Sequence, residues 1–273
     1  KCKGETLFPL DRKLRLRHDH WSEGAARVSA RQGFRSASFE EAADAYTDAV
    51  GGRISDSTVR RITEETGGSM AAWRTQEADK ASAPAQKGET PRTRRIEEHH
   101  PIQGQGNISS DGAMIRIRGE GWKEIKGAAI SQVEVLPPAE RHKGEKHRRD
   151  DEPIVKLTHH SYVAGLWDAN QFAPFQYAEG LRRNLEIVKK LSSVNDGSLW
   201  IERVTATNFS HAVQIVDWSH ADERVNDVAK AVFGEGTDQA ASWVESRLNE
   251  LWKGQIEAVV QAMLPLNADR SQK

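Results

Sequence analysis

Hydrophobic residues repeat at helical spacing in residues 38–50. The positions that fall on one face of the predicted helix are Phe39, Ala42, Ala43, Tyr46 and Val50. Ser38 with Glu41 three positions later is the capping-box pattern of a helix start. Gly51-Gly52 follows the last of these positions, as glycine often does at a helix end. We therefore predict one short helix over this range.

A second short helix is predicted directly afterwards, beginning at residues 55–58 and ending at Gly67-Gly68. Two short helices joined by a turn with glycine are typical of a helix-turn-helix. In the DNA-binding form, the second helix enters the major groove and would present Ser57, Arg60 and Arg61. A plain helical hairpin has the same pattern, so both interpretations stay open.

The pattern changes twice further along the chain. Residues 75–106 lose hydrophobic periodicity and read as a linker. From Asn107, apolar and polar residues alternate, which predicts strands at 107–118 and 122–135 around a Gly-Glu-Gly turn, and a third at 154–166. The elements predicted after them are a helix at 168–191, a strand at 191–194, a helix at 198–207, a strand at 212–216 and helices over 219–264.

This order predicts a mixed α/β fold. Three antiparallel strands followed by alternating helix and strand are the order of a ribonuclease-H-like core, and no dinucleotide or P-loop motif is present. The predicted domains are a helix-turn-helix-like domain at 1–74, a linker at 75–106, the core at 107–218 and a helical insertion at 219–273.

Charge and composition narrow the function classes. The chain has 273 residues with 39 basic and 40 acidic ones, a net charge of −1, which argues against binding by charge alone. Basic residues outnumber acidic ones by 18 to 16 over 1–106, whereas acidic ones lead by 12 to 7 over 192–273, a weak sign of nucleic-acid contact at the front. One cysteine, Cys2, excludes a disulfide framework. No apolar run is long enough for a membrane span, so a cytoplasmic protein is expected.

Two Asp-Gly steps carry the candidate chemistry. Asp111 lies in the first predicted strand, and Asp196 follows the fourth. Each step alone is more typical of a turn. Together, on adjacent strands of this order, they are expected to converge at one edge of the sheet. Paired carboxylates there can bind Mg²⁺, which activates a water or a 3′-hydroxyl in phosphodiester cleavage and strand transfer.

Asp217 and His220 form a third feature, three positions apart where a strand runs into a helix. Both can face one side of the first helical turn. The local interpretation makes Asp217 the N-cap of that helix and His220 a packed first-turn residue. The residues alone favour this interpretation over a functional one.

From Phe8 to Leu264 the chain resembles bacterial insertion-sequence DDE transposases of the Kra type, relatives of the Mutator-like transposases. The motifs that carry the resemblance are FPLD (8–11), SFEEAADAY (38–46), STVRRITEETG (57–67), SSDGAMI (109–115), WKEIKGA (122–128), NDGSLWI (195–201), VQIVDWSHADERV (213–225), FGEGT (233–237) and WVESRLNELWKG (243–254).

The resemblance implies a DNA transposase with a ribonuclease-H-like core. Asp111 and Asp196 match the first two catalytic, metal-binding aspartates, which use Mg²⁺ or Mn²⁺. Asp217 and His220 match a structural or DNA-positioning element. The implied partners are the terminal repeats of a mobile element, bound by a homo-oligomer on DNA.

The resemblance also implies that the segment is cut at both ends. The third acidic residue, a Glu, is expected beyond Lys273, downstream of the helical insertion. Relatives carry paired cysteines near the start, so Cys2 is expected to be the remnant of a Zn²⁺ knuckle. With two carboxylates, the segment is expected to be inactive or nearly so. The alternative is a non-catalytic, DNA-binding remnant of a mobile element.

Overall fold

The computed structural model of the chain describes residues 21–83, 99–138 and 151–268, with the single positions Leu10, Lys13 and Leu16, and gives the backbone alone for 265–268. Cys2, residues 84–98 of the predicted linker and residues 139–150 after the second strand lie outside the described residues. The chain forms two compact units, Lys1–Glu77 and Ala78–Lys273, and each is described by itself.

The first unit contains helices α2 (Glu23–Arg35), α3 (Phe39–Val50) and most of α4 (Asp56–Ser82). Their packed residues are small or branched: Ala26, Ala30, Ala42, Ala43, Val59 and Ile62. The predicted helix at 38–50 is confirmed. Ser38 accepts a hydrogen bond from the Glu41 amide, and Gly51 ends the helix in the left-handed conformation with φ of 74°. Helix α2 has no counterpart among the predicted elements.

Helix α4 corrects the prediction that the second helix ends at Gly67-Gly68. It continues through both glycines to Ser82, so residues 75–82 are helical rather than part of a linker. Glycine costs about 1 kcal/mol relative to alanine inside a helix, which favourable neighbours can offset. In the second unit, Ala78 and Ala81 supply part of that gain, because they pack against Ala178.

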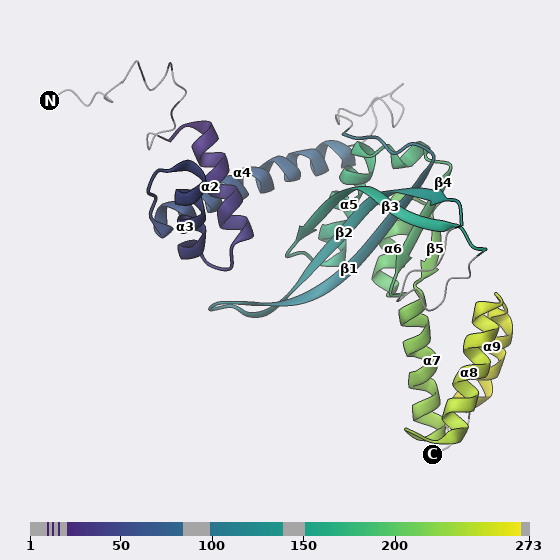
Figure 1. Cartoon of the computed structure of the whole chain (residues 1–273). Coiled ribbons are helices and arrows are strands. Elements are labelled where there is room, and N and C mark those ends of the chain that lie inside the picture. The colour runs from purple at the N-terminus through teal and green to yellow at the C-terminus, as the bar shows by residue number, and fades with distance from the viewer. Residues whose placement is uncertain are drawn as a thin grey trace. The chain divides into compact units, whose positions relative to one another are not determined.

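The second unit is built on a five-stranded mixed sheet (Figure 1). The strands are β1 (Gln105–Ile117), β2 (Gly121–Leu136), β3 (Ile154–Gly165), β4 (Lys190–Asn195) and β5 (Val213–Val216). Their order is β3-β2-β1-β4-β5. The first three strands are antiparallel, and β1, β4 and β5 are parallel. The predicted mixed α/β fold is therefore confirmed.

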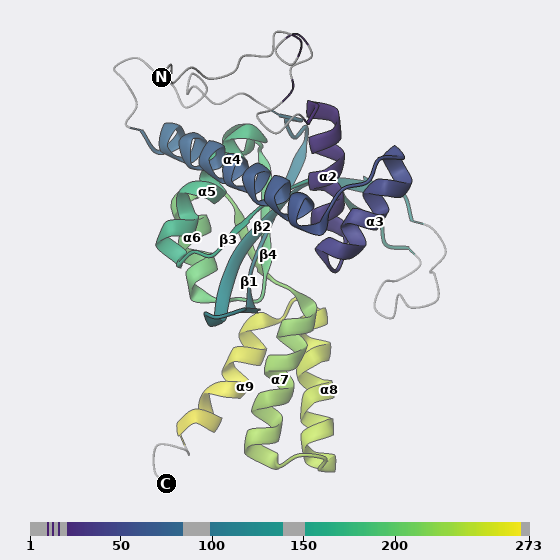
Figure 2. The same ribbon diagram turned by 90° about the vertical axis from the view of Figure 1, so that its left-hand side faces the viewer.

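Helices α5 (Ala169–Arg182) and α6 (Leu199–Asn208) lie on one side of this sheet (Figure 2). The core between sheet and helices contains Ile108, Ile130, Val163, Leu191, Phe172, Val204 and Phe209. Side chains alternate between the two faces of a strand. Residues next to Ile108 in sequence therefore belong to the opposite face of the sheet, and Asp111 shares that face.

Helix α5 is shorter than the predicted helix at 168–191. It begins at a complete capping box, in which Asp168 and Gln171 bond to each other's backbone. It ends at Arg182, and Asn184 then turns the chain with φ of 65° into a 3₁₀ turn at Leu185–Ile187. The chain reaches β4 three residues later. The apolar spacing of 185–188 therefore reflects core packing rather than a continued helix.

Strand β3 contains a bulge opposite Ser131, between the pairs Ile130–Ser161 and Gln132–Thr158. His159 takes the left-handed conformation there, with φ of 49°. The Nδ1 atom of His160 lies 2.7 Å from the Ser131 hydroxyl. The bulge inserts one residue and changes which residues of β3 face the helices.

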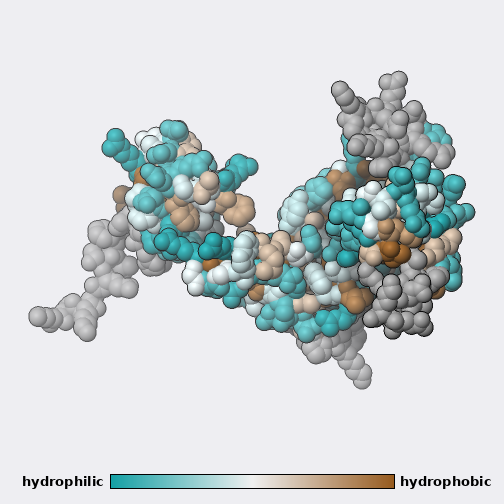
Figure 3. Space-filling model, turned by 90° about the horizontal axis from the view of Figure 1, so that it is seen from below, coloured by the Kyte–Doolittle hydropathy of each residue, from teal (hydrophilic) through white to brown (hydrophobic). Residues whose placement is uncertain are grey.

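Three further helices complete the second unit: α7 (Trp218–Phe233), α8 (Asp238–Trp252) and α9 (Ile256–Ala268). They agree with the predicted helices over 219–264 and their breaks at glycine. Viewed from below, the molecular surface is mostly hydrophilic, with hydrophobic side chains in small separate patches (Figure 3). In the described part of the chain, no helix combines the length and apolar character that a membrane span requires.

Candidate functional site

Asp111 lies on β1, and Asp196 and Asp217 directly follow the ends of the neighbouring strands β4 and β5. The β1–β4 ladder ends at the pair Ile108–Ser193, and Asp111 and Asp196 each lie three residues further along. The β4–β5 ladder ends at the pair Asn195–Val216, and Asp196 and Asp217 each lie one residue further. Parallel strands in register carry such residues side by side. The sequence predicts that Asp111 and Asp196 converge at one edge of the sheet. Their equal offsets from the last β1–β4 pair are compatible with this prediction.

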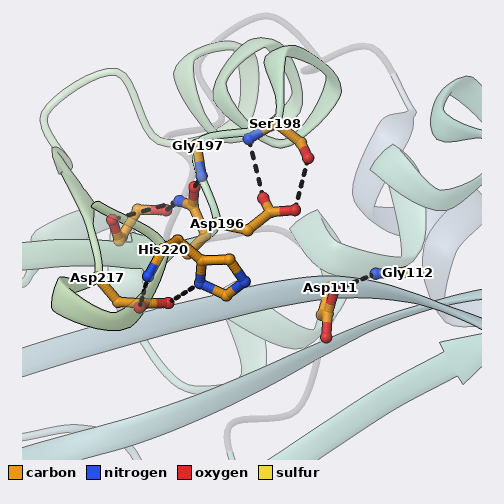
Figure 4. A network of polar contacts seen from close by, with 9 residues as sticks. Asp111, Gly112, Asp196, Gly197, Ser198, Asp217 and His220 are labelled. Carbon is orange, nitrogen blue, oxygen red and sulfur yellow. Dashed lines mark hydrogen bonds and ion pairs between the residues drawn. The ribbon is translucent and has the colours of Figure 1, made fainter. Parts of the chain in front are cut away.

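The carboxylate of Asp196 is engaged by the start of α6 (Figure 4). Its Oδ1 atom accepts a hydrogen bond of 2.8 Å from the Ser198 amide, and its Oδ2 atom accepts one of 2.6 Å from the Ser198 hydroxyl. Partial burial raises the pKa of Asp196, but the bonds from Ser198 and the charges of His220 and Arg224 outweigh it and hold the pKa below its ordinary value. Asp196 is thus ionised and fixed in orientation.

Asp217 and His220 form one unit at the start of α7. Asp217 is the N-cap: its Oδ1 atom accepts a hydrogen bond of 3.0 Å from the His220 amide. Its Oδ2 atom lies 2.6 Å from Nδ1 of His220. The hydrogen bond to Asp217 and the charges of Asp217, Asp196 and Glu223 raise the pKa of His220, against a smaller effect of burial. An imidazole that holds a proton more strongly than a free histidine therefore lies in the field of two aspartates.

The same contacts act on the carboxyl group of Asp217. Burial raises its pKa, and the hydrogen bonds from the His220 amide and ring, with the charge of His220, lower it further than burial raises it. The local interpretation from the sequence, an N-cap with a first-turn histidine, describes these contacts well. In addition, His220 places positive charge next to Asp196, which an N-cap alone does not require.

Asp111 is exposed, in contrast to the engaged Asp196. Its Oδ1 atom accepts a hydrogen bond of 2.7 Å from the Gly112 amide. Its partner on β2 is Gly127, which has no side chain to cover it. Among the residues drawn in Figure 4, no contact joins Asp111 to Asp196 or to His220. The backbone aligns the two aspartates, but Asp196 is turned toward Ser198.

The donor set suits a hard divalent cation, because Mg²⁺ and Mn²⁺ prefer carboxylate oxygens and water. A carboxylate has about four lone-pair sites, so the two bonds from Ser198 leave Asp196 able to bind an ion as well. In the described part of the chain, no cluster of three or more His, Cys, Asp or Glu side chains is arranged to hold a metal. The carboxylates of Asp111 and Asp196 have the chemistry of such ligands, but in the described residues they are not drawn together around a common point.

A hydrogen-bonded group of polar residues on β1 and β4 precedes the aspartates and was not identified from the sequence. Asn107 is almost fully buried, donates to the Ser109 hydroxyl over 2.9 Å and accepts from the Ser192 hydroxyl over 2.8 Å. These contacts tie β1 to β4 just before the aspartates. The alternating polar positions 107, 109 and 111 were the available signal, but the strand pairing that connects them to Ser192 is not visible in the sequence.

The predicted DNA-contacting residues lie on the first turns of α4. Arg60 and Arg61 are exposed and form ion pairs of 2.8 Å and 3.1 Å with Glu64 and Glu65, one turn further on. The Ser57 hydroxyl lies 3.0 Å from that of Ser55. These residues belong to the first unit, and their relation to Asp111 and Asp196 is not defined.

A cavity of about 760 Å³ lies apart from the aspartates, between α7 and α8. Trp218 and Trp252 line it, with their ring centroids 5.3 Å apart. The aspartates Asp111, Asp196 and Asp217 do not line it, so it is separate from the candidate site.

Comparisons with protein-family models and with curated proteins give no match to this chain.

Proposed function

We propose that this chain is a DNA transposase of the DDE type with a ribonuclease-H-like core. Its partners would be the terminal repeats of a mobile element, bound by a homo-oligomer on DNA in the cytoplasm. The observation that supports the proposal most is the equal offset of Asp111 and Asp196, each three residues beyond the last pair of the β1–β4 ladder. The sheet, in which β2 is antiparallel and β4 parallel to β1, agrees with the element order expected for such a core.

Asp111 and Asp196 would hold Mg²⁺ or Mn²⁺ through their carboxylate oxygens. When bound, the ion would lower the pKa of a water or 3′-hydroxyl and stabilise the leaving oxygen at phosphorus. Asp111 is the open ligand, exposed on its strand. Asp196 is held ionised and oriented by Ser198 before an ion arrives. The protonated form of His220 reduces the repulsion among neighbouring carboxylates and fixes the start of α7.

Two carboxylates bind a divalent cation more weakly than three, because ligand number sets affinity and geometry. We therefore expect weak Mg²⁺ binding and little or no cleavage from these residues alone. The alternative function is DNA binding without catalysis. The exposed Arg60 and Arg61 on α4 favour this alternative if α3 and α4 act as a helix-turn-helix.

The test combines ion binding with DNA cleavage. Mn²⁺ binding is followed by electron paramagnetic resonance, and Mg²⁺-dependent nicking is followed on supercoiled plasmid. Asp111→Asn is expected to weaken Mn²⁺ binding and abolish any nicking. Asp227→Asn, an exposed aspartate on α7, is the matched control and should change neither. Equal Mn²⁺ binding by the wild type and Asp111→Asn contradicts the proposed site. Salt-sensitive DNA binding without nicking supports the alternative.

A further inference from the structure

The β1–β2 hairpin continues well past the rest of the sheet. Pairing of β1 with β4 ends at Ile108, and pairing of β2 with β3 ends at Lys126. Beyond these points, the two strands pair only with each other, up to the pair Ile117–Gly121 and the turn that follows it. Residues 112–126 therefore form a two-stranded arm, which projects from the sheet in Figure 1.

The arm carries large apolar side chains in solvent. Trp122 is 65% exposed and Met114 is 60% exposed. Neither residue packs into a hydrophobic core of the described chain, so neither stabilises the fold to the extent that its size allows. Exposed aromatic and sulfur-containing side chains at the end of a projecting element are typical of a contact surface for a partner.

The arm also carries cations that are not neutralised. Arg116 lies opposite Trp122 in the register, and Arg118 lies in the turn. Within the described residues, neither arginine forms an ion pair through its side chain. Lys123 lies 3.9 Å from Glu120, at the limit of an ion pair between exposed groups. Over residues 112–126 there are four basic and two acidic residues.

We propose that this arm binds a DNA duplex, with Arg116 and Arg118 on backbone phosphates and with Trp122 and Met114, which share the face of Arg116, against the groove. This inference rests on the proposed function. A two-stranded β-ribbon fits the major groove of B-DNA. Arginines without an acidic partner in the described residues complement phosphates. The excess of positive charge on the arm therefore favours DNA, and a second copy of the chain is the competing partner, because Arg, Met and Trp are also enriched at protein–protein interfaces.

The test measures the salt dependence of DNA binding by the full chain, using a fluorescent duplex of arbitrary sequence. The variant replaces both arginines, Arg116→Ala with Arg118→Ala. The control replaces two exposed lysines before and at the start of β4, Lys189→Ala with Lys190→Ala. Each phosphate contact contributes about 0.9 to the slope of log affinity against log salt. The arginine variant should lose about 1.8 from this slope, and the control should lose none.

Raising the salt from about 50 to 200 mM weakens DNA binding, and the factor by which it weakens binding should be about 12 times smaller for the arginine variant than for the wild type. Trp122→Ala should weaken binding and leave the slope unchanged. If the wild type binds DNA and the arginine variant has the same slope, the arm does not contact phosphates; this inference is then wrong, and the proposed function is unaffected. If the wild type does not bind DNA, both this inference and the proposed function are wrong.

A second copy of the chain is the competing partner, and sedimentation velocity separates it from DNA. If Trp122→Ala dissociates an oligomer while the arginine variant keeps the wild-type slope, the arm is a protein interface and the proposal is wrong.

Discussion

Asp111 and Asp196 each lie three residues beyond the last pair of the β1–β4 ladder, Ile108 and Ser193. Their side chains nevertheless have different surroundings, because Asp111 is exposed and both oxygens of Asp196 accept hydrogen bonds from Ser198. Backbone register thus aligns the aspartates, and local bonding at the start of α6 decides which of them is fixed in orientation.

The Ser198 hydroxyl is expected to control the ionisation of Asp196. Ser198→Ala removes the bond to Oδ2, so the pKa of Asp196 should rise toward its ordinary value of 3.8. A carboxyl with a lowered pKa stabilises the fold above that value and loses its contribution as the pH falls. The variant should lose about 1 kcal/mol of unfolding free energy at neutral pH.

That difference between wild type and Ser198→Ala should disappear as the pH falls below the pKa of Asp196. The pKa is measured by carbon-detected NMR of the Asp196 carboxyl, and stability by urea unfolding. Ser246→Ala, an exposed hydroxyl in α8, serves as the control. An unchanged Asp196 pKa in Ser198→Ala contradicts the assignment.

His220 should titrate above its ordinary pKa of about 6.5, mainly because of its bond to Asp217. Asp217→Asn keeps an N-cap oxygen and removes the charge, so the pKa of His220 should fall in this variant. A histidine with a raised pKa stabilises the fold at pH values below 6.5, and this contribution disappears as the pH rises through the raised pKa.

The measurement is a nitrogen-15 NMR titration of the imidazole rings, with the His220 signal assigned by its absence from His220→Gln. The chain has ten histidines, so the others provide internal references. If His220 has the same pKa in the wild type and in Asp217→Asn, the ion pair does not control its protonation.

Arg183 is expected to be the most costly arginine to remove. It is 2% exposed, and its Nε and Nη1 atoms donate to the carbonyls of His100 and Ile130 over 2.8 Å and 3.3 Å. Arg183→Ala leaves a cavity and removes both donors, so we expect a loss of about 3 kcal/mol in urea unfolding. Arg203→Ala, an exposed arginine that bonds to Asn170, should cost about 0.5 kcal/mol or less. Equal losses would contradict this prediction.

Glycine-to-alanine changes should have opposite signs at two places. Gly67 and Gly68 lie inside α4 with open space around their Cα atoms, so Gly67→Ala and Gly68→Ala should each stabilise the protein by about 1 kcal/mol. Gly180 in α5 differs, because an added Cβ would lie 2.2 Å from the Phe209 ring. Gly180→Ala should destabilise the protein by about 2 kcal/mol or more. Thermal unfolding measures both, and a stabilising Gly180→Ala would show that α5 and α6 are less closely packed.

The sequence predicts those elements whose signals are local. The alternation in β1 and β2 and the Gly-Glu-Gly turn between them were sufficient for the hairpin, and Ser38 with Gly51 marked both ends of α3. Two helix ends were wrong because local signals competed with packing. Gly67-Gly68 did not end α4, and the apolar spacing after Arg182 belongs to core residues beyond the end of α5.

Long-range features were not predictable in the same way. The positions of Asp111 and Asp196 followed from the strand order, but their side-by-side register depends on the β1–β4 pairing. A regular alternation through β3 assigns residues 154–158 to the wrong face, because the bulge near His159 shifts the phase by one. The bonds from Ser198 to Asp196 depend on where α6 begins.

The contact between β1 and β4 has a consequence for the order of folding. The β1–β2 hairpin closes through a short turn, so it can form early. The β1–β4 pairing joins residues far apart in sequence: Ser192 donates to Asn107, 85 positions earlier. Such pairings form late, because the entropy of closing the loop must be overcome first. A chain with its hairpin formed and β4 not yet docked therefore contains both aspartates without the strand pairing that sets their relative position, so that position is established late in folding.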